Sequence, residues 1–275
     1  MPTSLSIRAF DLDTIKPYRK HLFVGGSGRG KSHCCFHVMS HIAPTVDVAL
    51  LMCPTETTRA LFQRRRLLPT SLMYDNLDLD VIGSAISVQR ELRQRGKQRH
   101  LLLILDDCSF DKKAWRQTAC CELLRNGRHL NITAFITCQY VLDLPPDARS
   151  NIDYCYACAD SCYKNVTRLH ESFFGCFKKA DEMHRVHSAC TKDFSLLVAD
   201  CTQVKVESPS DMIFYHRAPA KLPKMDPIGL PVYWKLEQRR HFEREQAAKA
   251  PNQPVVIPAT DAGGDKLRRA LVDAI

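Results

Sequence analysis

A glycine-rich stretch near the N-terminus constrains the fold of this chain more than any other feature. It reads GGSGRGKS and matches the pattern G-x-x-x-x-G-K-[ST] at every fixed position. Its residues are Gly25, Gly26, Ser27, Gly28, Arg29, Gly30, Lys31 and Ser32. Backbone N–H groups converge on phosphate oxygens only where side chains neither block the approach nor restrict the dihedral angles. The stretch, hereafter the phosphate loop, is therefore predicted to bind phosphate.

The segments on either side of the loop support this interpretation. The apolar run HLFV (21–24) predicts a strand before it, and residues 31–41 have the pattern of a helix after it. This order places a positive helix N-terminus at the phosphates. In such a site Lys31 reaches the β- and γ-phosphates and the Ser32 hydroxyl binds Mg²⁺. ATP with Mg²⁺ is the expected ligand; the alternative is a chance glycine-rich turn.

A second motif is an apolar strand that ends in two carboxylates. Residues 101–105 read LLLIL, and Asp106 and Asp107 follow. A buried strand delivers its last residues to the sheet edge beside the phosphate loop. Asp106 is expected to hold Mg²⁺ directly or through water, and Asp107 to orient or deprotonate the attacking water. The pair indicates an ATPase; the alternative is a strand that runs into an acidic turn.

The next apolar run, Ile132–Cys138, ends in Gln139, whose amide would contact the γ-phosphate or the attacking water. A strand-end glutamine that faces solvent is the competing interpretation. Arg149 is a candidate arginine finger, a side chain that enters the site of a neighbouring subunit, and Arg128 competes for that role. For either arginine, a surface or ion-pair role is the alternative.

Strand-like and helix-like stretches alternate along most of the chain and predict an α/β fold. Apolar runs typical of strands are His21–Val24, Val46–Cys53, Leu101–Leu105, Ile132–Cys138, Ile152–Ala157, Phe194–Ala199 and Met212–Tyr215. Helix-like stretches are Lys31–His41, Glu56–Arg66, Val81–Arg95, Lys113–Arg125, Tyr163–Phe174 and Phe177–Cys190. Such alternation favours a central, mostly parallel sheet between helices.

The composition changes near residue 219. Seven of the 15 prolines lie beyond residue 218, interrupted by one charged, helix-like segment, Tyr233–Lys249. Residues 1–218 are therefore predicted to form a P-loop ATPase domain. Residues 219–275 are predicted to form a proline-rich, charged C-terminal tail that is partly extended.

Net charge and hydropathy exclude some classes of protein. Lysine plus arginine outnumber the acidic residues 39 to 30, a basic excess that permits contact with a polyanion without requiring it. Cationic clusters are Arg64–Arg66, then Arg90, Arg93, Arg95, Lys97 and Arg99, and finally Arg239 and Arg240. They would track a phosphate backbone or simply solvate helix faces.

No run reaches the roughly 18 apolar residues of a membrane span, and no signal peptide is recognisable, so a protein that is neither secreted nor membrane-spanning is expected.

The cysteines are odd in number, 13 in all, which predicts a reducing compartment and not a disulfide framework. Six cysteines and histidines that lie near one another in the sequence are candidate metal ligands: Cys155, Cys158, Cys162, His184, His187 and Cys190. This group contains a C-x₂-C zinc spacing, but period 2 in the expected strand puts Cys155 and Cys158 on opposite faces. Structural zinc is therefore set aside.

Taken together, these motifs resemble those of the poxvirus-type genome-packaging ATPases of the FtsK–HerA group of additional-strand P-loop ATPases. The segments that carry the resemblance are GGSGRGKS, LLLILDD, GRHLNITAFITCQ and LPPDARSNIDY, then LHESFFG, FSLLVADCTQ and DMIFYHRA. They span roughly residues 19–217. The phosphate loop is common to many ATPases, whereas GRHLNI…TCQ followed by RSNIDY is more specific. Proteins of this type occur in large DNA viruses of eukaryotes and in related small double-stranded DNA viruses.

The resemblance implies a RecA-like core, a ring-shaped homo-oligomer and translocation of double-stranded DNA, held mainly by its backbone, into a preformed capsid. It assigns the binding of nucleotide and Mg²⁺ to Lys31 and Ser32, and it identifies Asp106 and Asp107 as the second, acidic motif. It makes Gln139 the sensor, the side chain that contacts the γ-phosphate or the attacking water. Asp107 is shorter than the Glu that many relatives of the wider group carry. Capsid, portal or vertex proteins are the implied partners, at an assembly site in the host cytoplasm or nucleus or in the virion.

Three other functions compete with this one. A cellular or plasmid DNA pump or helicase would share the core, and the small size of the chain favours the viral form. A P-loop small-molecule kinase needs no activated water, so the two aspartates and Gln139 disfavour it. A non-hydrolysing nucleotide-binding scaffold is disfavoured by the intact Lys31, Ser32 and acid pair.

Overall fold

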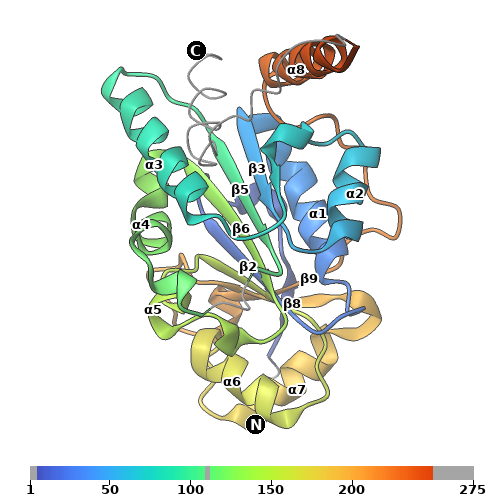
Figure 1. Cartoon of the computed structure of the whole chain (residues 1–275). Helices are drawn as coiled ribbons and strands as arrows, with labels where there is room; N and C mark the ends of the chain where they lie inside the picture. Colours follow the sequence, from blue (N-terminus) through green and yellow to red (C-terminus); the bar gives the residue numbers. More distant parts are fainter. Residues whose placement is uncertain (1–4, 109–111, 250–275) are drawn as a thin grey trace.

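A nine-stranded sheet forms the centre of the computed structural model, which describes residues 5–108 and 112–249 (Figure 1). Its strands are β1 (Arg8–Ala9), β2 (Lys20–Val24), β3 (Val48–Met52), β4 (Met73–Tyr74), β5 (Leu101–Asp106), β6 (Ile132–Cys138), β7 (Tyr154–Ala157), β8 (Leu196–Asp200) and β9 (Ile213–His216). The order is β1-β9-β8-β7-β2-β6-β5-β3-β4. Neighbouring strands are parallel except in the two pairs that β8 makes, so among the described strands β8 alone runs against the others.

The position of β6 defines the type of fold. It is inserted between β2, which leads into the phosphate loop, and β5, which carries the acid pair. An inserted strand at this place is what distinguishes the additional-strand P-loop ATPases, so the predicted fold class is confirmed. The seven expected strands all form. The strands β1 and β4 were not predicted, because strands of two residues carry no periodicity.

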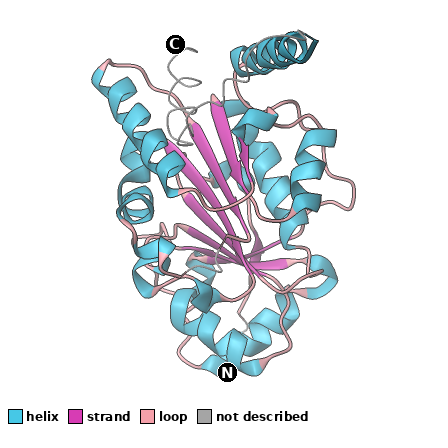
Figure 2. Cartoon of the chain, in the orientation of Figure 1, coloured by secondary structure: helices cyan, strands magenta, loops and turns pink. Residues whose placement is uncertain are grey.

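Helices cover both faces of the sheet (Figure 2). They are α1 (Lys31–Ile42), α2 (Glu56–Arg64), α3 (Leu79–Gln94), α4 (Thr118–Asn126), α5 (Pro146–Arg149), α6 (Tyr163–Phe173), α7 (Ala180–Cys190) and α8 (Pro231–Lys249). The alternation of side chains along β2 sends Leu22 and Val24 into the core layer of α3, α4 and α6, and Phe23 into the layer of α1 and α2. None of the helices within the described ranges combines the length and the apolar character that a bilayer-crossing segment requires.

Several expected elements begin or end at other residues than predicted, and two of these differences have a clear cause in the backbone. The helix expected over Lys113–Arg125 is a 3₁₀ turn, Ala114–Arg116, followed by α4, because the backbone of Gln117 is extended (φ −72°, ψ 152°). The strand expected from Phe194 begins two residues later, at Leu196, because Phe194 has a left-handed backbone (φ 60°). Because of this second difference, Phe194 lies outside the sheet, in the loop before β8.

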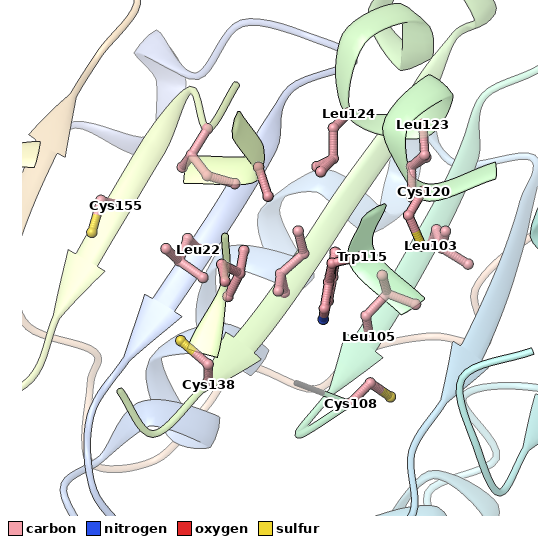
Figure 3. Packing of buried hydrophobic residues seen from close by; sticks show 14 of the residues in the cluster. Leu22, Leu103, Leu105, Cys108, Trp115, Cys120, Leu123, Leu124, Cys138 and Cys155 are labelled. Carbon is pink, nitrogen blue, oxygen red and sulfur yellow. The ribbon is translucent and has the colours of Figure 1, made fainter. Parts of the chain in front are cut away.

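The buried layer beneath α4 is continuous and contains several thiols (Figure 3). Leu103 and Leu105 of β5 lie with Trp115 and Cys120 in this layer, all almost fully buried. Burial raises the pKa of the Cys120 thiol to about 12. All 13 cysteines are free, and eight of them are buried, as expected for cysteine used as a small apolar residue.

The start of the predicted tail is attached to the domain. Its backbone N–H groups at Ile228 and Leu230 donate to the carbonyl oxygens of Leu67 (2.9 Å) and Asp47 (2.8 Å). Gly229 between them has a φ of 93°, and an added Cβ would lie 3.0 Å from the Asp47 oxygen. The expected helix over Tyr233–Lys249 forms α8. The boundary after residue 218 stays a prediction, and residues 250–275 lie outside the described part of the chain.

Candidate nucleotide site

A cleft of about 620 Å³ opens at the carboxyl edge of the parallel strands. It is lined by Asp106, Asp107, Gln139 and most of the phosphate loop, namely Gly26, Ser27, Gly28, Gly30, Lys31 and Ser32. The structure therefore brings together predicted site residues that lie as far apart as 26 and 139 in the sequence. We call it the nucleotide cleft.

The loop geometry explains its glycines. Gly28 and Gly30 have φ values of 73° and 88°, which favour glycine. Gly25 is required for space: a Cβ built there would lie 2.5 Å from the Cβ of Cys158. Gly30 caps α1 without a side-chain hydrogen bond, so the first N–H groups of that helix are left for an anion.

Lys31 points across the loop toward the neighbouring strand. Its Nζ donates to the carbonyl oxygens of Gly25 (3.2 Å) and Cys138 (3.3 Å). Cys138 ends β6, one residue before Gln139. The ammonium group is thus held between the phosphate loop and the strand that carries the predicted sensor.

The two aspartates are positioned by a threonine that the sequence analysis missed. The Thr137 hydroxyl donates to Asp106 Oδ1 (2.7 Å) and accepts from the backbone N–H of Asp107 (2.9 Å). The strand register explains this contact, because Asp106 on β5 is paired with Thr137 on β6. Gln139 Nε2 in turn donates to Asp107 Oδ2 (3.4 Å). One hydroxyl and one amide therefore fix the directions of both carboxylates.

A thiol completes the surroundings of Asp106. Cys53 Sγ donates to Asp106 Oδ2 at 3.3 Å. Burial, followed by the nearby Asp106 charge, raises the pKa of Cys53 to about 12, so the thiol keeps the proton that it donates. No pattern in the sequence indicates this role, because Cys53 follows an apolar run in which a small apolar residue is expected.

The donor set suits Mg²⁺. Ser32 and Asp106 both line the cleft and offer a hydroxyl and a carboxylate oxygen, the ligand type that this small hard cation prefers. Mg²⁺ in such sites keeps several waters and is held by one or two protein oxygens plus substrate phosphates. The residues present therefore fit the ion.

The structure separates the two candidate arginine fingers. Arg149, at the end of α5, donates from Nη1 to the carbonyl oxygens of Leu144 (3.3 Å) and Val141 (3.4 Å), within its own loop. Arg128 is exposed on the 3₁₀ turn Gly127–Leu130, which precedes β6. Neither lines the nucleotide cleft of its own chain.

The cysteine and histidine group serves the packing of the loop. Cys155 is fully buried in β7, and Cys158 packs against Gly25 of the phosphate loop. His187 hydrogen-bonds through Nε2 to the Cys158 carbonyl oxygen at 2.9 Å. In the part of the chain that the structure describes, no three potential metal ligands gather at one point.

The cleft is also lined by residues that the sequence motifs did not indicate. Asp193 and Phe194 reach it from just before β8, and Arg217, Ala218 and Ala220 reach it from just after β9. Phe194 was interpreted as the first residue of a strand, and nothing in its neighbourhood signalled a loop.

The fold and the site together define a P-loop ATPase of the additional-strand type. The sequence profile described as "Poxvirus A32 protein" matches residues 10–179, well over half of the chain. The chain belongs to this family.

Individual relatives agree with that assignment. The uncharacterized protein 088R of Invertebrate iridescent virus 3 is 27% identical over 228 residues, covering 79% of this chain and 86% of the relative. The uncharacterized protein 015R of Frog virus 3 is 23% identical over 265 residues, covering 96% of this chain and 79% of the relative. Among solved structures, the genome-packaging NTPase B204 of Sulfolobus turreted icosahedral virus 2, in complex with ATPγS, matches with a TM-score of 0.55 and 19% identity. The match covers 74% of this chain and 98% of B204, and at this identity it establishes the shared fold.

Proposed function

We propose that this protein is an ATP-hydrolysing motor that translocates double-stranded viral DNA into a preformed capsid. Membership of the poxvirus A32 protein family and the fold shared with a genome-packaging NTPase support the proposal. The observation that carries the hydrolytic part is the acid pair, since Thr137 and Gln139 direct both carboxylates into the cleft that Lys31 enters.

Each residue has a distinct part in the reaction. The phosphate loop N–H groups and Lys31 bind the β- and γ-phosphates and neutralise their charge. Asp107, oriented by Gln139, accepts a proton from the attacking water or aligns it for in-line attack. Ser32 and Asp106 are assigned to Mg²⁺, which when bound supplies charge neutralisation at the phosphates. Positioning and electrostatics account for most of the catalysis in this class of reaction.

A ring-shaped homo-oligomer is part of the proposal, because neither candidate finger lines the cleft of its own chain. Arg149 is engaged by carbonyl oxygens of its own loop, whereas Arg128 is exposed. We therefore assign the finger that enters a neighbouring subunit to Arg128. Capsid or vertex proteins are the remaining partners, and the C-terminal tail is the segment that we assign to them.

The cationic clusters differ in how free they are to contact DNA. In the cluster on and after α3, three arginines form ion pairs with carboxylates: Arg90 with Glu122, Arg95 with Glu91 and Arg99 with Asp47. At the end of α2, Arg64 and Arg66 are exposed, and within the described residues no carboxylate forms an ion pair with either. Arg64 and Arg66, like Arg93 and Lys97 of the α3 cluster, are therefore candidates for contacts with the DNA backbone, which carry affinity without reading sequence.

The test is ATP turnover with and without linear double-stranded DNA at two salt concentrations. We expect DNA to stimulate turnover and salt to weaken the stimulation, because cations that neutralise phosphates compete with counterions. Lys31→Ala and Asp107→Asn should abolish turnover in both conditions. The motor function would be refuted if the assembled oligomer hydrolysed ATP at the same rate with and without DNA. Phosphate transfer to a nucleoside in place of water would also refute it.

A further inference from the structure

We propose that Phe194, which lines the nucleotide cleft beside the start of α1, is a stacking platform for the nucleotide base. The ligand class is a nucleoside di- or triphosphate, recognised through the flat face of its base. The inference rests on the proposed function, because it extends the same cleft from the phosphates to the base.

The reversed direction of β8 brings Phe194 to this place. Because β8 is antiparallel to β7, its first residue lies at the carboxyl edge of the parallel strands, where the phosphate loop also lies. Leu196 of β8 is paired with His216 of β9. The residues just before Leu196 and just after His216 therefore meet beside the loop, and the cleft lining contains members of both segments.

Phe194 lies directly against the start of α1. An added Cβ at Gly30 would be 3.3 Å from the Phe194 Cβ and 3.4 Å from its Cδ1. Phe194 is nevertheless 68% exposed and lines the cleft. A large, mostly exposed aromatic side chain next to a phosphate-binding helix start offers the surface on which a base stacks.

The backbone around Phe194 is held in an unfavourable conformation. Asp193 and Phe194 have consecutive positive φ values of 50° and 60°. Left-handed backbone is rare for an aromatic residue, and such strain concentrates at ligand clamps. The turn is closed by the Ser195 N–H, which donates to the Lys192 carbonyl oxygen at 2.9 Å. This left-handed turn therefore places Phe194 at the cleft instead of letting it continue into β8.

The second segment is also fixed in place. His33 of α1 hydrogen-bonds through Nε2 to the Pro219 carbonyl oxygen at 2.8 Å. Ala218 and Ala220 on either side of Pro219 line the cleft with small side chains. Both segments are thus held at the start of α1, and beside Arg217 the second segment presents these two small side chains to the cleft.

The experiment compares a ligand that has a base with one that has none. Equilibrium binding of ADP and of inorganic tripolyphosphate, each with Mg²⁺, is measured on the full chain and on Phe194→Ala, Phe194→Tyr and Lys31→Ala. We expect Phe194→Ala to weaken ADP binding about ten- to one hundred-fold, the range that loss of one aromatic–base stack produces, and to leave tripolyphosphate binding unchanged. Phe194→Tyr, which keeps the ring, should retain ADP affinity. Tyr163→Ala removes an exposed ring outside the cleft and should change neither ligand.

Three results would overturn the platform. Equal weakening of ADP and tripolyphosphate by Phe194→Ala would mean that Phe194 only shapes the phosphate loop through Gly30. Unchanged ADP binding together with a lower oligomeric mass would mean that the ring contacts a neighbouring subunit. Unchanged binding and unchanged mass would leave the ring without a role. The proposed function fails separately if the unaltered chain binds ADP but its ATP turnover does not change when DNA is added. If the unaltered chain binds neither ADP nor tripolyphosphate, both proposals fail.

Discussion

Replacing Gly25 by alanine tests whether the phosphate loop is set by close packing against β7. The new Cβ would lie 2.5 Å from the Cβ and 2.8 Å from the Sγ of Cys158. Carbon atoms in contact prefer about 3.5–4.0 Å, so the overlap is about 1 Å. Cys158 is unable to retreat easily, because it is buried and its N–H donates to the Val24 carbonyl oxygen at 2.8 Å.

The overlap sets the expected size of the effect. Overpacking of a well-packed core costs about 1–3 kcal/mol, which for a chain of this size lowers Tm by about 2–12 °C. The measurement is thermal unfolding followed by circular dichroism. Gly26→Ala is the matched control, because a Cβ there meets nothing closer than Arg29 Cγ at 4.0 Å.

A second substitution separates packing from other effects of alanine. Cys158→Gly removes both clashing atoms and should restore most of the stability lost in Gly25→Ala, after its own cost is subtracted in a double-mutant cycle. Cys158→Ala keeps the Cβ and should restore little. The reasoning is refuted if Gly25→Ala costs no more than Gly26→Ala, or if Cys158→Gly and Cys158→Ala restore stability equally.

Three further predictions follow from contacts at the site and in the core. Thr137→Val removes the hydroxyl that orients both aspartates and should lower the kcat for ATP about 10- to 100-fold; unchanged kcat would contradict this. Burial, with Lys20 second, lowers the pKa of His21 from 6.5 to about 3, so between these values the unfolded chain binds a proton that the folded chain does not, and the free energy of unfolding decreases as the pH falls. Urea unfolding at pH 7 and pH 5 should show a loss of about 2 kcal/mol from this residue, which His21→Phe removes; an equal pH slope in the variant would refute the assignment. Arg128→Ala should lower turnover of the assembled oligomer by about 10³-fold while leaving ADP affinity intact, whereas Arg149→Ala should lower Tm; the reverse pattern would assign the finger to Arg149.

Local pattern was enough to locate the phosphate loop and the acid strand. The glycines, Lys31 and Ser32 are contiguous, and Asp106 ends an uninterrupted apolar run, so both motifs are visible without knowledge of the fold. The parallel sheet followed from the alternation of strands and helices. Gln139 was found for the same reason, as a polar residue at the end of a strand.

Long-range register was not visible in the sequence. Thr137 acts on Asp106 only because β6 is paired with β5, and Phe194 reaches the cleft only because β8 runs against its neighbours. The spacing of Cys158 suggested only a metal ligand. Its contact with Gly25 depends on how β7 lies beside β2, which the spacing does not reveal. These relations between strands decide which side chains meet, and no short window of residues contains them.

The left-handed backbone at Asp107 (φ 54°) also bears on which residues this position accepts. An aspartate codon becomes a glutamate codon by a change in its third base alone, so the longer acid is always a single mutation away. Aspartate and asparagine tolerate this conformation, whereas for other residues it costs roughly 1–2 kcal/mol. The genetic code thus offers glutamate readily while the chain geometry opposes it, and a lineage that acquired it would also need to reshape the turn after β5.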